Sequence, residues 1–179
     1  MNQFRKIETP LPDVFVLERF RHEDARGPFT KTFNAGMLAD LGLGDGSGFA
    51  ESICSTSTKG VIRGMHYQRP PYAHDKIVSV VQGEILDVVV GVRPDNKGQV
   101  FGEVLTDKNA RTLFIPAGYA HGFLVLSESA TVVYHTDKGH HQASEAGVIY
   151  SSIDFNWPVN SPKLSVKDSQ LTSISHAEW

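Results

Sequence analysis

The sequence predicts an all-β protein of the sandwich or barrel type. Short apolar stretches recur at regular spacing along most of the chain, and Gly, Pro or Asp-Lys-Asn breaks separate them. Only one short stretch has a convincing helical pattern, and we find no internal repeat, low-complexity segment or linker. A chain of 179 residues is long enough to bury a core, so we expect one domain over residues 1–179.

The composition excludes several classes of protein. The formal net charge is −3 and no block of basic residues occurs, so electrostatic binding of nucleic acid is not expected. The single cysteine, Cys54, cannot form a disulfide within the chain, which is typical of the reducing cytoplasm. No apolar run has the length of a signal-peptide core or of a membrane span, so we expect a cytoplasmic protein that binds no membrane.

The first fifty residues predict two strands and the one helix. Residues 14–20 form an apolar first strand, residues 24–28 form a turn, and residues 29–33 alternate as a second strand. Residues 35–41 predict a short helix, because Gly42 and a glycine-rich loop as far as Gly48 end the helical pattern.

From residue 50 onward the pattern predicts one strand after another, and Gln82-Gly83 marks a hairpin-like break. The tail from Trp157 to Trp179 is expected to form an irregular, partly helical cover. The predicted strands are residues 50–57, 60–68, 76–81, 84–92, 100–106, 112–115, 122–126, 131–135 and 148–151.

The stretch Gly60-Val-Ile-Arg-Gly-Met-His-Tyr-Gln68 is the most informative strand. Its alternation places Gly64, His66 and Gln68 on one face and Arg63 on the other. Because Gly64 has no side chain, we expect open space over the His66 ring that a substrate could occupy. A packed core histidine is the alternative when His66 is considered alone.

A second stretch, Ile115-Pro-Ala-Gly-Tyr-Ala-His-Gly-Phe-Leu124, makes a turn and then carries His121 into an apolar strand. Its Pro-x-Gly-x-x-His pattern resembles the second motif of the cupins, which are double-stranded β-helices, or jelly rolls. The resemblance therefore narrows the fold to a cupin-type jelly roll.

The usual first cupin motif contains His-x-His, but this chain has His66-Tyr67-Gln68 at that place. A three-histidine metal site would have to recruit His74, His135, His140 or His141 from elsewhere in the chain. A bound metal needs several ligands at suitable spacing, and no such spacing is present. We therefore expect neither a metal nor another cofactor.

A cupin without a metal has to do polar chemistry with its side chains. His66 and His121 can exchange protons near neutral pH, and Asp168 could orient a histidine. Arg26 and Arg63 could hold a phosphate through paired hydrogen bonds.

Lys76 opens a strand, so its ammonium could lie at the barrel mouth, and Tyr134 lies on another strand. Each group also has a simpler interpretation. Lys76 and Arg63 would then be surface charges, Tyr134 a half-buried packing residue, and Asp168 a solvated residue of the tail. Their joint fit to one reaction favours the functional interpretation.

Over nearly its whole length the chain resembles the dTDP-4-dehydrorhamnose 3,5-epimerases of nucleotide-sugar pathways. The resemblance implies a metal-free cupin that is usually a homodimer, in which N-terminal strands exchange and one subunit helps to complete the other's site. The motifs that carry it are Asp24-x-Arg-Gly-x-Phe29, Gly60 to Gln68, Lys76-Ile-Val-x-Val-Val-x-Gly-Glu-Ile-x-Asp-Val-Val89, Ile115 to Phe123, Val125-Leu-Ser-Glu128 and Leu164-Ser-x-Lys-Asp168.

The resemblance also implies roles for individual residues. His66 is similar to the base that removes a proton beside the C4 ketone, Asp168 to its orienting partner, Lys76 to the cation near the enolate, and Tyr134 to the acid on the opposite face. The substrate-binding residues that it implies are Arg26 and Arg63 for the diphosphate, Phe29 for the nucleobase, and His121, Glu51 and Gln68.

The chain departs from the family pattern at three places near the nucleotide and the sugar. Lys31 replaces a usual Glu, and Glu51-Ser52-Ile53 replaces a Gln-x-Asn segment, so dTDP, CDP and GDP all remain open as the nucleotide. Residues 136–141 lack the two tyrosines of the usual Thr-x-Tyr-Tyr segment. We therefore predict epimerisation at C3 or C5 alone, or action on an unusual sugar.

Three other functions remain as alternatives. A 3,4-ketoisomerase of the same sugar class would move the carbonyl, although the pattern of His66, Lys76, Tyr134 and Asp168 favours an epimerase. A metal-dependent cupin would need ligands that the spacing does not supply. A sugar-binding cupin would use the same groups without turnover.

Overall fold

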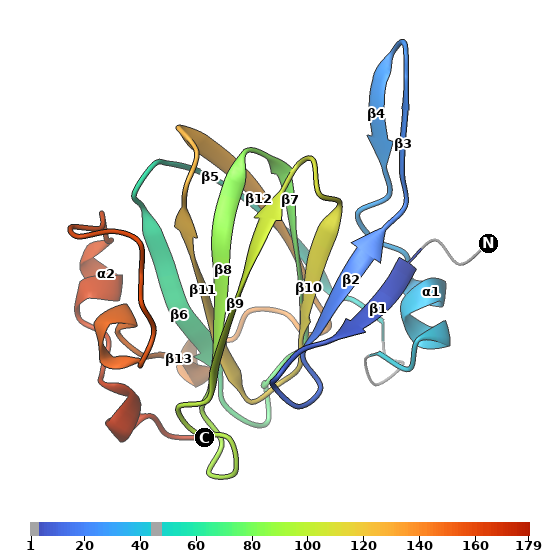
Figure 1. The fold of residues 1–179 in the computed structure, drawn as a ribbon. Coiled ribbons are helices and arrows are strands. Elements are labelled where there is room, and N and C mark those ends of the chain that lie inside the picture. The colour runs from blue at the N-terminus through green and yellow to red at the C-terminus, as the bar shows by residue number, and fades with distance from the viewer. Residues whose placement is uncertain (1–3, 44–47) are drawn as a thin grey trace.

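The computed structural model describes residues 4–43 and 48–179, and its core consists of two facing antiparallel sheets (Figure 1). The six-stranded sheet contains, in spatial order, β1 (Phe4–Glu8), β2 (Phe15–Arg19), β10 (Arg111–Ile115), β7 (Lys76–Gln82), β12 (Ser129–Thr136) and β5 (Glu51–Thr58). The five-stranded sheet contains β13 (Glu145–Gly147), β6 (Ile62–Gln68), β11 (Tyr119–Val125), β8 (Glu84–Gly91) and β9 (Val100–Thr106).

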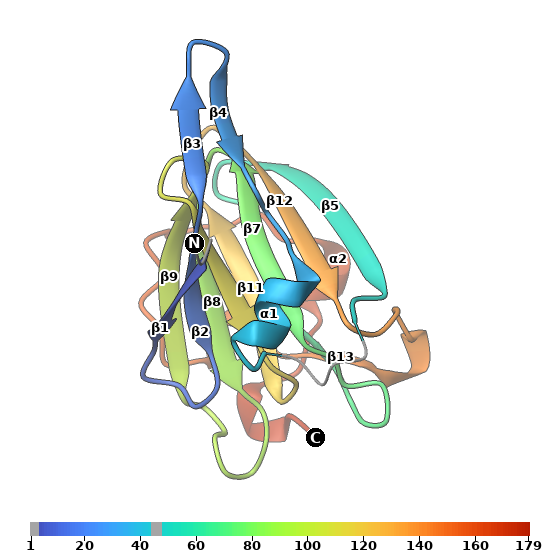
Figure 2. The same cartoon turned by 90° about the vertical axis from the view of Figure 1, so that its right-hand side faces the viewer.

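A separate hairpin of β3 (Arg21–Asp24) and β4 (Gly27–Thr30) projects beyond both sheets (Figure 2). No helix within the described ranges has the length and apolar character needed to cross a membrane. The helices are α1 (Ala35–Asp40), α2 (Val166–Ser169) and the 3-10 turns η1 (Gln142–Ser144), η2 (Tyr150–Ser152) and η3 (Ile174–His176).

The main hydrophobic core lies between the two sheets. Val78 and Leu113 reach it from the six-stranded sheet, and Val89, Leu105 and Phe123 reach it from the five-stranded sheet. All five side chains are at most 1% exposed. Alternation along each strand therefore divides the inner face from the outer face.

Each sheet also carries apolar side chains on its outer face, and a different segment covers each. Leu38 of α1 packs in one cluster with Ile77, so the helix covers the six-stranded sheet (Figure 2). The C-terminal tail brings Ile153 into a cluster with Met65 and Val88, on the outside of the five-stranded sheet (Figure 1). The predicted all-β jelly roll, the short helix near residues 35–41 and the partly helical tail are confirmed.

The predicted strand at residues 148–151 is wrong. The segment contains the 3-10 turn Tyr150–Ser152. Val148 exchanges two backbone hydrogen bonds with Met65 of β6 and makes an isolated bridge to Thr172, but no strand continues from it. Val148 is fully buried, so its apolar character reflects packing beneath the tail rather than membership of a long strand.

Three features near the N-terminus also differ from expectation. The second strand, predicted at residues 29–33, is β4 and ends at Thr30. Strands β1 and β3 were not predicted, because Arg, Lys, Glu, His and Asp residues interrupt their apolar pattern. Residues 44–47 of the expected glycine-rich loop lie outside the described residues.

Strand β6 contains a bulge that changes which side chains face inward. His66 pairs with His121 and Arg63 pairs with Phe123, so β6 has one residue more than β11 between these pairs. Arg63 and His66 therefore line the same pocket between the sheets. The prediction that they lie on opposite faces is wrong, since the extra residue reverses the alternation.

The bulge depends on Gly64. Its φ is +116°, and an added Cβ would lie 2.6 Å from both Gly122 Cα and the His121 carbonyl oxygen. Gly64 therefore does not supply the open space expected beside His66, and the His66 side chain lines the pocket between the sheets. Gly64 instead allows the backbones of β6 and β11 to approach closely.

We expect Gly64→Ala to lower the free energy of unfolding by about 3 kcal/mol, because the new methyl group meets backbone atoms and φ is unfavourable. The matched control is Gly98→Ala, where φ is +81° and nothing lies within 4 Å of the added Cβ. Its expected loss is about 1 kcal/mol. Denaturant unfolding measures both values, and equal losses would contradict the role given to the contact with Gly122.

Candidate active site

A cavity of about 390 Å³ opens between the sheets. Its walls come from strands of both sheets and from the C-terminal tail. It brings together all the predicted site residues except Arg26 and Phe29, namely Glu51, Arg63, His66, Gln68, Lys76, His121, Tyr134 and Asp168.

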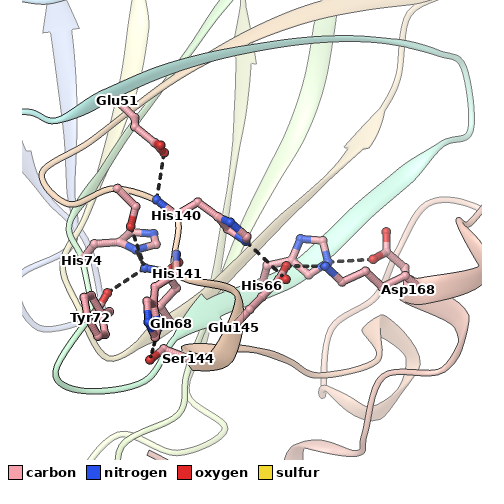
Figure 3. Close-up of polar contacts among 12 residues, drawn as sticks. Glu51, His66, Gln68, Tyr72, His74, His140, His141, Ser144, Glu145 and Asp168 are labelled. Atoms are coloured by element: carbon pink, nitrogen blue, oxygen red, sulfur yellow. Dashed lines mark hydrogen bonds and ion pairs between the residues drawn. The ribbon is translucent and has the colours of Figure 1, made fainter.

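His66 and Asp168 form a hydrogen-bonded pair across the edge of the five-stranded sheet (Figure 3). His66 Nε2 lies 2.7 Å from Asp168 Oδ1, and Asp168 is only 5% exposed. The cap of α2 helps to place this carboxylate, because the Ser165 hydroxyl accepts a hydrogen bond from the Asp168 amide. Asp168 Oδ2 accepts a longer bond, 3.4 Å, from the amide of Gly64 in the bulge.

Asp168 is held in its charged form. Burial acts to raise the pKa of its carboxyl, but the hydrogen bond and charge of His66, together with the hydrogen bonds of Gly64 and Ser165, outweigh burial and leave the pKa below its ordinary value. When His66 is neutral, an ionised Asp168 can accept the proton of its Nε2. The Nδ1 lone pair of His66 is then available to take a proton.

Lys76 lies beside this pair at the start of β7. Its Nζ donates a hydrogen bond of 3.2 Å to the backbone carbonyl of His66. Burial lowers the pKa of Lys76 to about 8, although Asp87 and Glu145 act in the opposite direction. The ammonium therefore remains charged at neutral pH and begins to lose its proton in mildly alkaline solution.

A second buried pair joins His121 to Asp87. His121 Nε2 lies 2.6 Å from Asp87 Oδ1, and Asp87 is 0% exposed. Within the described residues, Asp87 Oδ2 has no hydrogen-bond partner. The sequence reasoning missed Asp87 as a site residue, although a carboxylate within the apolar run of residues 84–92 was a usable signal.

Tyr134 reaches the pocket from the opposite sheet. Its hydroxyl lies 3.3 Å from Ser55 Oγ, and its ring packs edge-on against His121 at 5.9 Å between centroids. Burial raises the pKa of Tyr134 far above its ordinary value, and the bond to Ser55 acts in the opposite direction. Since β6 and β12 belong to different sheets, His66 and Tyr134 border the cavity from its two sides.

Arg63 is held by a neighbouring hydroxyl group. Its Nε donates a hydrogen bond of 2.8 Å to Ser57 Oγ on β5. No pair with a carboxylate is recorded for Arg63 in the described part of the chain. A guanidinium without a protein carboxylate is suited to an anionic ligand.

Gln68 uses its amide to hold the wall of the pocket (Figure 3). Its Nε2 donates to the Tyr72 carbonyl at 2.8 Å and lies 2.9 Å from His74 Nδ1. Its Oε1 accepts from the His141 amide at 2.6 Å. Burial, followed by the charge of Lys76, lowers the pKa of His74 to about 3, so His74 is a neutral partner.

Glu51 contacts the same wall of the pocket, where its carboxylate accepts a 3.1 Å hydrogen bond from the His140 amide. The His140 ring approaches Glu145 at 3.4 Å, and Glu145 also pairs with Lys167 at 2.5 Å (Figure 3). Glu51 and Gln68 thus contact the loop that follows Thr136. Sequence reasoning placed both at the substrate but not at this loop.

Arg26 and Phe29 lie on the projecting hairpin and do not line this pocket (Figure 2). The Arg26 side chain is 89% exposed and pairs with Asp24 at 2.7 Å. Phe29 is 64% exposed. Among the residues for which the structure gives positions, no three His, Cys, Asp or Glu side chains gather as a metal site.

The family model for dTDP-4-dehydrorhamnose 3,5-epimerase matches residues 8–176. The chain belongs to this family. A Shigella flexneri dTDP-4-dehydrorhamnose 3,5-epimerase is 42% identical over 177 residues, which cover 97% of each chain.

Solved structures have the same fold. The Legionella pneumophila epimerase in complex with dTDP-4-keto-L-rhamnose has a TM-score of 0.91 and 34% identity, covering 98% of this chain and 95% of that one. A 4-keto-6-deoxy sugar epimerase from Streptomyces spheroides also has a TM-score of 0.91, at 28% identity, covering 97% of this chain and 89% of that one. The family resemblance noted from the motifs is confirmed.

We expect Gln68→Leu to lower the free energy of unfolding by about 2–4 kcal/mol, because loss of this buried amide leaves its polar partners in two loops unpaired. Gln82→Leu is the control, since Gln82 is exposed on β7 and its change should stay within about 0.5 kcal/mol. Denaturant unfolding compares the two. A Gln68→Leu protein as stable as the control would show that this amide does not hold the wall.

Proposed function

We propose that this chain is an epimerase of a nucleotide-diphosphate-linked 4-keto-6-deoxyhexose in deoxysugar biosynthesis. It inverts C3, C5 or both by removing a proton beside the C4 ketone and returning one from the opposite face. The observation that carries the proposal is the His66–Asp168 pair on one sheet with Tyr134 on the facing sheet.

In this mechanism His66 is the base. Asp168 holds Nε2, so Nδ1 receives the proton, and the carboxylate stabilises the imidazolium that forms. Because the C4 ketone accepts the electron pair, the C–H group beside it is acidic enough for a histidine to remove its proton. Enolate formation then places negative charge on O4.

Lys76 and His121 are suited to stabilise that charge. The Lys76 ammonium is partly buried beside His66, where an electrostatic interaction is stronger than in water. Asp87 orients the His121 ring in the same cavity. Both groups would interact more strongly with the enolate than with the ketone, which lowers the barrier.

Tyr134 is the acid in this proposal. A single residue acting from one side would mostly return the proton to the face from which it came. Inversion therefore requires a proton donor on the other side of the ring, and the two-sheet cavity supplies His66 and Tyr134 on different walls.

Arg63 binds the diphosphate, since its guanidinium lines the cavity and is oriented by Ser57. Arg26 and Phe29 would act in a second subunit, because the hairpin carries them away from their own pocket. Their exposure supports a homodimer with exchanged N-terminal segments. In this proposal residues 1–179 form one domain. The protein is located in the cytoplasm.

The nucleotide is most simply dTDP, as in the relatives, while Lys31 and Glu51 keep CDP and GDP as alternatives. Glu51 and Gln68 shape the wall of the sugar site through the backbone of residues 140 and 141. Their contribution to substrate binding is therefore expected to be indirect.

The direct test is exchange in D2O with dTDP-4-keto-6-deoxyglucose, followed by NMR at C3 and C5. The wild-type enzyme should incorporate deuterium at one or both carbons. His66→Ala should lower exchange by about 10²–10⁴-fold, since the general base is lost. His176→Ala, which changes an exposed histidine of the tail, should behave as wild type.

Exchange at both carbons would identify a 3,5-epimerase, and exchange at one carbon would identify the inverted centre. A carbonyl that moves to C3 would indicate a ketoisomerase instead. The same assay is repeated with the CDP and GDP sugars, and absence of exchange with all three would contradict the proposal. Continued exchange in His66→Ala would remove His66 from the mechanism.

The pH profile tests Lys76. Because its pKa is lowered to about 8, the ammonium is present below that pH, and kcat should fall as pH rises through it. Lys76→Met should lower kcat by about 10²-fold and abolish this alkaline limb. Lys59→Met, a change at an exposed lysine, is the control that should keep it. An alkaline limb unchanged in Lys76→Met would assign that limb to another group.

A further inference from the structure

Ser55 is a pocket-lining hydroxyl that the mechanism above does not use. It lies on β5, half-buried, next to the strand that carries Tyr134. Ser55 pairs with Val132 and Ile53 pairs with Tyr134 in the β5–β12 register. Ser55 and Tyr134 are thus diagonal neighbours on one face of the sheet, where side chains of this length can meet.

Tyr134 needs a partner if it is an acid. When its proton moves to carbon, a phenolate remains in a buried place, where burial already raises the pKa of the phenol. Ser55 Oγ, at 3.3 Å, is the one hydrogen-bond partner of the Tyr134 hydroxyl within residues 4–43 and 48–179. The nearby Arg63 Nε is directed to Ser57 instead.

We propose that Ser55 is a relay residue that acts through Tyr134. As the Tyr134 O–H bond breaks and the enolate pair forms the new C–H bond, the Ser55 hydroxyl donates to the phenolate oxygen. Ser55 then passes its proton to that oxygen and takes a replacement from water in the cavity. His66 releases the abstracted proton to solvent, so the protons balance over one inversion.

This inference rests on the proposed function and makes a separate prediction. Proton removal by His66 does not involve Ser55, whereas reprotonation from the Tyr134 side does. Loss of the Ser55 hydroxyl should therefore separate the two half-reactions. A purely structural role for Ser55 would change both to the same extent.

The chain supplies a control two residues along the same strand face. Ser57 Oγ accepts a 2.8 Å hydrogen bond from Arg63 Nε and has no recorded contact with Tyr134. Ser57→Ala should raise KM for a nucleotide-diphosphate sugar without separating exchange from inversion. The two serines thus differ in the partner that they hold.

The experiment incubates each variant with dTDP-4-keto-6-deoxyglucose in D2O and measures two rates by NMR. One is deuterium entry with retained configuration, and the other is inversion. For Ser55→Ala we expect retained exchange at the wild-type rate and inversion slowed about tenfold or more, because a hydrogen bond to a charged group is lost.

A second pair of variants at the same position tests whether Ser55→Ala acts only by perturbing strand β5. Ser55→Thr keeps a hydroxyl and should restore the wild-type ratio of inversion to exchange. Ser55→Val has nearly the same shape without the hydroxyl and should not restore it. Thermal unfolding of the pair shows whether the two variants are equally folded.

Equal loss of both rates in Ser55→Ala, or no change in their ratio, would overturn the relay. The same holds if Ser55→Val matches Ser55→Thr. A wild-type enzyme with neither exchange nor inversion would instead overturn the proposed function, and the relay with it.

Discussion

The close contact between Gly64 of β6 and Gly122 of β11 is the constraint on which the site depends. A Cβ on Gly122 would lie 2.6 Å from the Arg63 carbonyl oxygen, and one on Gly64 would lie 2.6 Å from Gly122 Cα. With neither present, β6 accommodates one extra residue, which turns Arg63 and His66 to the same side. The amide of Gly64 also donates a hydrogen bond to the carboxylate of Asp168, so the bulge that turns His66 inward also contacts the hydrogen-bond partner of His66.

Burying charged groups in this cavity costs free energy. Asp87 and Asp168 are almost fully buried, and each is paired with a histidine, since an unpaired buried carboxylate would strongly favour its neutral form. Burial lowers the pKa of Lys76, while the negative charge of Asp87 raises it. The carboxylate of Asp87 thus favours the charged form of Lys76. Such a site lowers the stability of the fold, and the apolar core between the sheets, together with the apolar clusters on their outer faces, offsets this loss.

Much of the fold was predictable because alternation and glycine or proline breaks are local signals. This holds for β7, β8 and the helix α1, whose observed bounds are close to the expected ones. The inward direction of Arg63 was not predictable, since it depends on a glycine in a strand almost sixty residues later in the chain. The same limit applies to the contacts of Gln68, whose partners lie in two loops. Long-range contacts decided each of these outcomes.

In the proposed mechanism, selectivity between C3 and C5 comes from the wall of the pocket rather than from the acid and the base. Both carbons flank the same ketone, so one base and one acid can serve either carbon if the sugar ring is held in the matching position. Residues 136–141, which lack the two tyrosines of the family pattern, form part of that wall. Glu51 and Gln68 hold the amides of residues 140 and 141, and Tyr72 stacks on His141 at 3.7 Å between ring centroids. The side chains of Gln68 and Glu51 therefore fix the backbone of this loop, and in the proposed mechanism the position of the sugar ring depends on how the loop is held.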